Sequence, residues 1–124
     1  MELRSSVAMD KRASLRFDVI FPVVISSEEF GPVRCIARNL SSGGMFVEAL
    51  EPIPIGLNVK VHFVMERSQG EITAQGRIIN HYYLAFHHDG EIRSLVGMGI
   101  KFLEFEPESA ETLDNCLSRC KTIH

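Results

Sequence analysis

The clearest pattern in the sequence is LNVKVHFVM, residues 57–65, in which apolar and polar residues alternate. The apolar positions are Leu57, Val59, Val61, Phe63 and Met65, and the polar positions are Asn58, Lys60 and His62. Successive side chains of a β-strand point to opposite faces of its sheet. The alternation therefore predicts a strand that turns one face to a core and the other to solvent.

Similar stretches on both sides of it predict further strands. They are residues 17–26, 33–40, 45–48, about 71–88 and 95–105. Turn-forming residues separate these stretches, at 28–32, 41–44, 51–56, 67–70 and 88–90. Pro22 cannot donate a backbone hydrogen bond, which predicts an edge position or a bulge in the first strand. The run His81–Phe86 is unusually aromatic. We expect it in the barrel core; the alternative is that it is exposed and forms a partner surface.

The C-terminal segment has the features of a helix. Pro107 suits the first turn, where its missing N–H costs nothing. Acidic residues at the start and basic residues at the end match the helix dipole; they are Glu108, Glu111, Arg119 and Lys121. The apolar stripe is Leu113, Cys116, Leu117 and Cys120. Six or seven short strands and one helix favour a mainly β fold, a closed or nearly closed antiparallel barrel whose open end or exposed edge the helix covers.

Composition narrows the class of protein. The 124 residues match one domain, and 45% hydrophobic residues suffice for one core. A net charge of −3 argues against a nucleic-acid-binding surface. The sequence has no apolar run long enough to cross a membrane and no secretion signal, so we expect a cytoplasmic protein without membrane insertion. It has no phosphate loop or nucleophile–base pair, so we expect no enzyme and no cofactor.

Cysteine and histidine positions give little support to a metal site. Three cysteines without a secretion signal argue against a disulfide framework. The spacing of Cys116 and Cys120 could supply two metal ligands, but no second pair matches it, and burial on the helix is the preferred interpretation. His81, His87 and His88 are close in sequence without a carboxylate or cysteine to complete a site, so we expect no metal.

Two polar patterns stand out at the ends of predicted strands. Arg12-x-x-x-Arg16 joins a basic N-terminal segment to the first strand, and Asn39-x-Ser41-x-x-Gly44 follows the second. Taken alone, the Arg12/Arg16 pattern is also explained by a disordered tail without function. The Asn39/Ser41/Gly44 pattern is also explained by an ordinary turn. A second R-x-x-x-R pair, Arg34-x-x-x-Arg38, lies within a predicted strand and is interpreted as solvated charge on its outer face.

Together and in this order, the patterns resemble those of the PilZ domain family. The resemblance rests on KRASLR (11–16), NLSSGGMFV (39–47) and GMGIKF (97–102), and covers about residues 10–120. It implies a six-stranded antiparallel PilZ-like β-barrel followed by a C-terminal α-helix. We therefore expect a flexible basic arm over residues 1–11 and a single domain over residues 12–124. The usual ligand of the family is cyclic di-GMP, and the resemblance implies that ligand here.

The resemblance also implies roles for individual residues. Arg12 and Arg16 would grip guanine edges and phosphates, because the arginine fork matches the O6 and N7 acceptors of guanine. Asn39 would bind polar atoms of a guanine, with the Ser41 hydroxyl beside it. Lys11, just before the first arginine, would influence whether one ligand or a stacked pair is bound.

Gly43 and Gly44 complete the set of ligand-binding residues that the resemblance implies. We expect a positive φ there, or a place where a side chain would strike the ligand; a role in the turn alone is the alternative. The expected function is a cyclic di-GMP receptor that rearranges its arm and signals to a protein partner in bacterial motility, biofilm or virulence. It would be a monomer or a ligand-dependent dimer. The alternative is a PilZ-like adaptor that does not bind the nucleotide.

Overall fold

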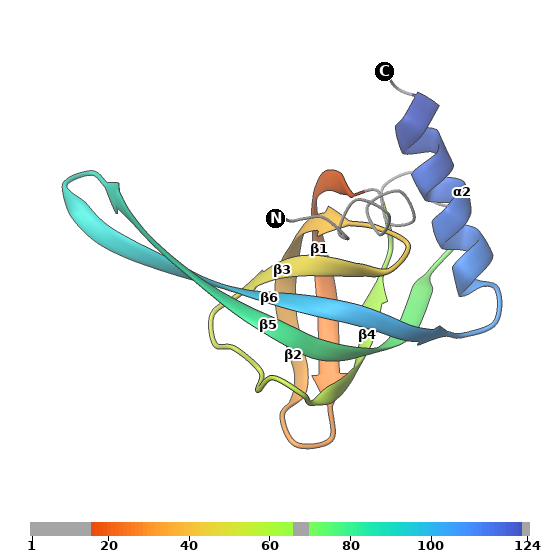
Figure 1. Cartoon of the computed structure of the whole chain (residues 1–124), viewed down its shortest axis with the longest axis horizontal. Helices are drawn as coiled ribbons and strands as arrows, with labels where there is room; N and C mark the ends of the chain where they lie inside the picture. Colours follow the sequence, from red (N-terminus) through yellow and green to blue (C-terminus); the bar gives the residue numbers. More distant parts are fainter. Residues whose placement is uncertain (1–15, 66–69, 123–124) are drawn as a thin grey trace, which may run out of the picture.

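The computed structural model describes residues 16–65 and 70–122, which contain six strands and one helix (Figure 1). The elements are β1 (Phe17–Ser27), β2 (Gly31–Leu40), β3 (Gly44–Ala49), β4 (Asn58–Phe63), β5 (Ile72–His88), β6 (Glu91–Phe105) and α2 (Ser109–Thr122). The strands form a closed antiparallel barrel in the order β1-β2-β3-β6-β5-β4, and β4 pairs with β1 to close it. The predicted fold class is confirmed. The division into an arm and a domain falls partly outside the described residues and stays a prediction.

The barrel interior is built by the alternation seen in the sequence. In β4, Val59, Val61 and Phe63 are buried, whereas Asn58 and Lys60 are exposed. Phe63 stacks on Phe21 of β1, with ring centroids 5.2 Å apart. The predicted inward face is therefore correct, although β4 is shorter than the predicted 57–65.

Pro22 lies at an edge-like position of β1. The pairing of β1 with β2 shifts register between Asp18 and Phe21, and β1 pairs with β4 only over residues 24–26. Pro22 falls between these two places, so its missing N–H removes no bond to β4. Pro22 thus pairs with Ile36 of β2, has no partner in β4, and follows an irregularity in the strand, which agrees with the predicted edge position or bulge.

Helix α2 packs beside the start of β5 (Figure 1). Leu113, Cys116 and Leu117 are buried with the barrel core, as their spacing predicts. The predicted start at Pro107 is wrong, because Glu108 has a left-handed φ of 73° and the helix begins at Ser109. The Ser109 hydroxyl accepts a hydrogen bond from the Thr73 N–H at 3.0 Å, which ties α2 to β5. This helix, the one in the described ranges, is not long and apolar enough to cross a membrane.

Strands β5 and β6 form a hairpin that extends far beyond the barrel (Figure 1). β6 begins at Glu91 rather than at the predicted Leu95, and the turn at Asp89 and Gly90 has φ values of 53° and 82°. Tyr82 is 48% exposed and Tyr83 is 69% exposed, so the expected core position of the aromatic run is wrong. The run lies where the barrel has ended, and no interior remains for it to fill.

Candidate functional site

The two polar patterns of the sequence meet at one end of the β1–β2 pair. The register pairs Asp18 with Asn39, which places Arg16, just before β1, beside the end of β2. The Arg16 Nη1 donates a hydrogen bond to the Asn39 Oδ1 at 2.8 Å. Antiparallel pairing thus joins residues 23 positions apart. Lys11 and Arg12 lie outside the described residues.

Ser41 holds the turn between β2 and β3 together. Its side chain is completely buried, and its Oγ accepts hydrogen bonds from the N–H groups of Gly43 at 3.1 Å and Gly44 at 3.2 Å. The Ser41 backbone N–H donates to the Gly44 carbonyl at 2.9 Å. The hydroxyl that the resemblance assigns to a ligand therefore faces the turn in this structure, where it accepts hydrogen bonds from two backbone donors.

The two glycines of the turn do not have the predicted positive φ; the glycines that do are Gly31, Gly56 and Gly90. Gly44 is already part of β3 and pairs with Lys101 of β6. A Cβ at Gly44 would lie 2.3 Å from the Ile100 carbonyl oxygen, so the close approach of two backbones requires glycine here. Gly43 is exposed, and its carbonyl accepts the Phe102 N–H at 2.9 Å.

A shallow hollow of about 710 Å³ opens on the outer face of the barrel beside Asn39. It is lined by Asp18, Val19, Ile20, Arg38, Asn39, Phe46, Glu48 and Leu95. We call it the outer groove. Arg38 and Asn39 are neighbours in the chain, yet both line it, because the β2–β3 register shifts between Ala37 and Asn39. The alternation of residues in the sequence cannot reveal such a bulge. It predicts only that Arg38 is a charge on the outer face of the strand.

The groove has a fixed aromatic wall. Phe46 packs edge-on against Tyr82, with ring centroids 5.1 Å apart. Its ring also covers Gly97, where a Cβ would lie 2.2 Å from the ring. The ring is thus held between β3 and the hairpin, beside Asn39, and it can serve as a platform for a planar base. Nothing in the alternation of β3 marks Phe46 as a groove residue, and its place next to the Ser41–Gly44 pattern was the available signal.

Charges in and beside the groove balance. Arg38 forms an ion pair with Glu48 across β2 and β3. Asp18 lies in the groove lining, and Arg16 lies at its rim through the contact with Asn39. These two cations and two carboxylates leave no net charge among them, so a multiply charged anion would require further cations from elsewhere in the chain.

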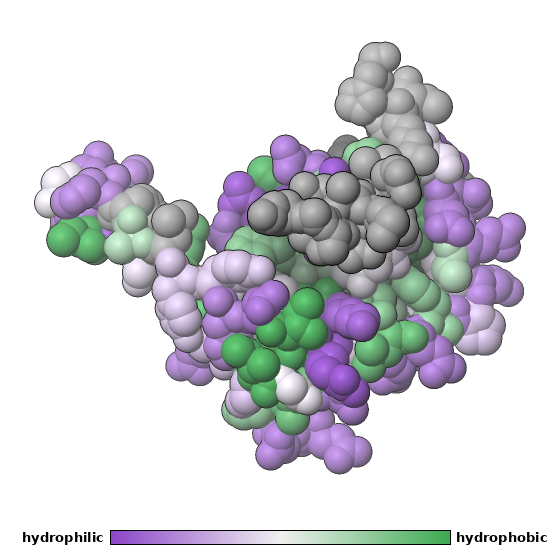
Figure 2. All heavy atoms as spheres, in the orientation of Figure 1, coloured by the Kyte–Doolittle hydropathy of each residue, from purple (hydrophilic) through white to green (hydrophobic). Residues whose placement is uncertain are grey.

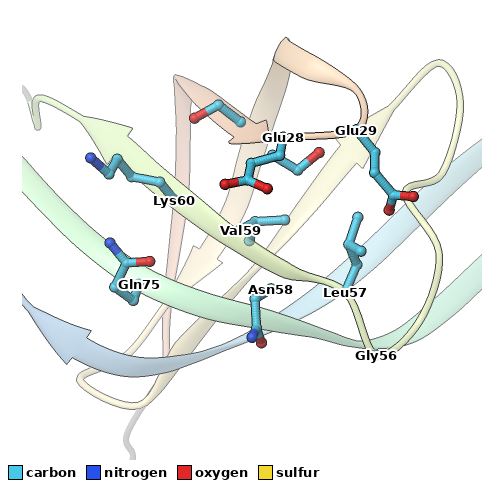
Figure 3. A pocket seen from close by; sticks show the side chains of 10 residues that line it. Glu28, Glu29, Gly56, Leu57, Asn58, Val59, Lys60 and Gln75 are labelled. Carbon is cyan, nitrogen blue, oxygen red and sulfur yellow. The ribbon is translucent and has the colours of Figure 1, made fainter.

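A second hollow, of about 770 Å³, lies at the opposite end of β2 (Figure 3). It is bounded by the β1–β2 turn and by the start of β4, and Glu28, Asn58 and Lys60 surround its opening. None of the predicted site residues lines it. The outer groove is therefore the candidate site.

The described part of the chain offers no metal centre, since no group of three or more His, Cys, Asp or Glu side chains within it could hold an ion. Cys35 and Cys116 are buried in the core, and neither is part of a disulfide. Burial raises the pKa of the Cys35 thiol to about 11, which keeps it protonated near neutral pH.

Comparison with known proteins identifies the family and the solved structures that this fold resembles. The PilZ domain profile matches residues 10–119, whereas no curated protein matches the sequence. Among solved structures, the PilZ domain of YcgR from Escherichia coli, with c-di-GMP, is 14% identical, with a TM-score of 0.65 over 91% of this chain and 99% of that one.

Two longer proteins share the fold. The inhibitor of motility MotI/DgrA of Bacillus subtilis is 17% identical, with a TM-score of 0.66 over 90% of this chain and 52% of its own. MrkH of K. pneumonia, in its c-di-GMP complex, is 13% identical, with a TM-score of 0.68 over 87% and 50%. This chain spans about half the length of both. On the match of its sequence over residues 10–119, the chain belongs to the PilZ domain family.

Proposed function

We propose that this chain is a receptor for cyclic di-GMP and that the ligand occupies the outer groove. The observation that carries the proposal is the contact of Arg16 with Asn39 at the rim of that groove, because it unites the two patterns typical of the family. Structures of two similar proteins, YcgR and MrkH, are described with c-di-GMP, which supports the same ligand class here.

The chemistry of the rim suits guanine. The arginine fork donates two parallel hydrogen bonds to the O6 and N7 acceptors of guanine, and the asparagine amide offers both a donor and an acceptor. In the proposal, Arg16 exchanges its bond to Asn39 for bonds to the base, which frees the Asn39 Oδ1 to accept from guanine N–H groups. Phe46 stacks on a base from the groove wall.

Because the charges of the groove balance, we infer that the N-terminal arm supplies the cations that the ligand needs. Cyclic di-GMP is a dianion, and the described groove residues offer it no net attraction. We assign the missing cations to Lys11 and Arg12, which lie outside the described residues. Binding would then draw the arm over the groove, a rearrangement that a protein partner can detect. Lys11 decides between one ligand and a stacked pair.

The turn residues act indirectly in this proposal. Ser41 and Gly44 shape the turn and the β3–β6 contact, and thereby fix the position of Asn39. Gly43, which is exposed, can lie against the ligand. The proposed output is a change of surface and not a chemical reaction, passed to a partner in motility, biofilm or virulence control from a cytoplasmic location.

Calorimetric titration with cyclic di-GMP tests the proposal. We expect binding by the wild type that excess GTP does not displace, and a Kd that rises about tenfold to a hundredfold in Arg16→Ala, since a good bidentate contact is worth roughly 1–3 kcal/mol. Arg12→Ala and Asn39→Ala should weaken binding as well. Arg34→Ala is the matched control, because it removes an exposed arginine of β2 that does not line the groove.

Two results would contradict the proposal. One is a folded wild type that binds no cyclic di-GMP, which would favour the adaptor alternative. The other is equal weakening by Arg34→Ala and Arg16→Ala, which would show a general charge effect. The ratio of ligand to chain, measured in the wild type and in Lys11→Ala, tests the role of Lys11.

A further inference from the structure

The outer half of the β5–β6 hairpin loses its neighbouring strands, first on the side of β5 and then on the side of β6. β4 pairs with β5 only as far as Arg77, and β3 pairs with β6 only from Val96 onward. Val96 pairs with Tyr83, so the hairpin is a two-stranded ribbon from Leu84 to its turn and back to Leu95 (Figure 1). We call residues 80–95 the free hairpin, because no strand pairs with the β5 edge over this length. Two strands alone are marginally stable in water, and a third or fourth strand stabilises such a ribbon.

The free hairpin exposes apolar side chains on both faces. Tyr82 and Tyr83 follow each other on β5, so their side chains point to opposite faces, and Ile92 on β6 is 74% exposed. Leu50, which follows the end of β3, is 97% exposed. Figure 2 shows hydrophobic atoms near the tip of the hairpin and over the barrel below it. Exposed apolar side chains on both faces of one hairpin suit an interaction site.

The outer edge of β5 lacks the usual protection against pairing. Residues 79–88 contain no Asp, Glu, Lys or Arg, and histidine is their only titratable type apart from tyrosine. Edge strands are normally blunted by charges, proline or bulges. The loop before β4 is bonded to Ile78, by the Gly56 N–H at 2.7 Å and the Leu57 carbonyl at 3.1 Å, and its Ile53 carbonyl contacts the His81 ring at 2.6 Å. Among the described residues, this loop makes no backbone–backbone bond to β5 after Ile78, so the open backbone edge begins there. A strand can be added there without burying a formal charge.

Charges at the two ends of the hairpin indicate which strand could pair with the open edge of β5. At the base, Arg77 and Lys101 pair across β5 and β6, and both are exposed. At the tip, Asp89 and Glu91 are highly exposed, and Arg93 near Glu91 offsets one of them. An antiparallel copy of the same hairpin brings each acidic tip to the basic base of the other. The surface is therefore complementary to itself, as a twofold interface requires.

We propose that the free hairpin pairs with the same hairpin of a second copy of this chain, β5 against β5 and antiparallel. The product is a four-stranded sheet with a barrel at each end. The open edge, residues 80–88, spans about 27–30 Å at 3.3 Å per residue, which separates the two barrels. A twofold axis at Leu84 aligns the whole edge and sets Tyr83 of one copy opposite Ala85 of the other. The pairing edge of β5 does not line the outer groove, although Leu95 of the hairpin does and Tyr82 packs on Phe46. The proposed pairing does not require cyclic di-GMP.

Sedimentation velocity over a range of protein concentrations tests the proposal. The wild type should shift from monomer to dimer, and Tyr83→Lys/Ala85→Lys should raise the dimer Kd about tenfold or more, because like charges directly opposite each other destabilise a sheet. The matched control is Val64→Lys/Leu103→Lys, which adds the same charge at exposed positions outside the free hairpin. It should dimerise like the wild type.

A single Ala85→Lys provides a milder variant if the double variant unfolds, and it should raise the Kd in the same direction. Combining Tyr83→Lys with Ala85→Glu should restore the dimer, since each lysine then faces a glutamate of the other copy. A wild type that stays monomeric throughout would overturn the proposal. So would a dimer that the hairpin lysines and the control lysines weaken equally.

Discussion

The inner and outer halves of the β5–β6 hairpin belong to the same two strands and both carry apolar side chains, but only the inner half buries them. In the inner half, Ile72, Ala74 and Ile78 of β5 and Ile100 of β6 are at most 2% exposed. In the outer half, Tyr82, Tyr83 and Ile92 are 48–74% exposed. The two halves differ in their neighbours, because β4 pairs with β5 only as far as Arg77 and β3 pairs with β6 only from Val96, opposite Tyr83, inward. Alternation therefore specifies a strand with two faces, but neighbouring strands decide whether a face is buried.

The largest expected difference between the halves concerns core packing. Ile78→Ala should lower the free energy of unfolding by about 2–5 kcal/mol, since it leaves a cavity at a completely buried position. Tyr83→Ala, on the outer half, should change it by less than about 0.5 kcal/mol. Urea unfolding in dilute solution measures both. Equal losses at the two positions would show that the outer half is packed as tightly as the barrel.

A pair of glycines sharpens the comparison at the barrel wall. Gly44→Ala should cost about 2 kcal/mol or more, because its Cβ would meet the Ile100 carbonyl oxygen at 2.3 Å. Gly99→Ala, with its nearest contact at 3.6 Å from a side-chain atom, should be tolerated. Thermal denaturation of both variants checks this. If Gly44→Ala has the same Tm as the wild type, β3 and β6 do not approach each other as closely as the structure indicates.

Loss of a buried hydroxyl should have a smaller effect than loss of core volume. Ser41→Ala removes the acceptor of two N–H groups, so we expect a loss of about 1–2 kcal/mol. Ser94→Ala, exposed on the outer half, is the control and should be neutral. Denaturant unfolding distinguishes them. A neutral Ser41→Ala would mean that water replaces the hydroxyl and that Ser41 is free to serve a ligand.

The smallest expected effect is a pH dependence from the barrel interior. The pKa of the Cys35 thiol rises from 9.0 to about 11, so the folded protein holds the proton more tightly than the unfolded chain. This contribution to stability is complete below pH 9 and is lost as the pH approaches 11, by about 1 kcal/mol at pH 10. Unfolding at pH 8 and 10 should show this difference in the wild type and not in Cys35→Ala. An identical pH dependence in both proteins would exclude Cys35 as its source.

The candidate site, like the hairpin, combines buried residues that stabilise the fold with exposed residues that are available for contacts. Its sequence pattern combines residues with two different duties: Ser41 and Gly44 satisfy and shape the backbone, whereas Arg16 and Asn39 present polar groups at the groove rim. A pattern in the sequence cannot separate these duties, because both require the same residue types at the same spacing. The structure separates them by burial and by hydrogen-bond partners.

The sequence by itself determined the strands, the turns between them and the barrel class, because alternation and turn propensity are local properties that neighbouring residues along the chain express. It also identified residues 39–44 as a special turn. Only the tertiary structure decided the bulge that turns both Arg38 and Asn39 outward, the contact of Arg16 with Asn39, and the extension of the hairpin beyond the barrel. These features depend on the register and the ends of strands distant in sequence, which no local pattern encodes.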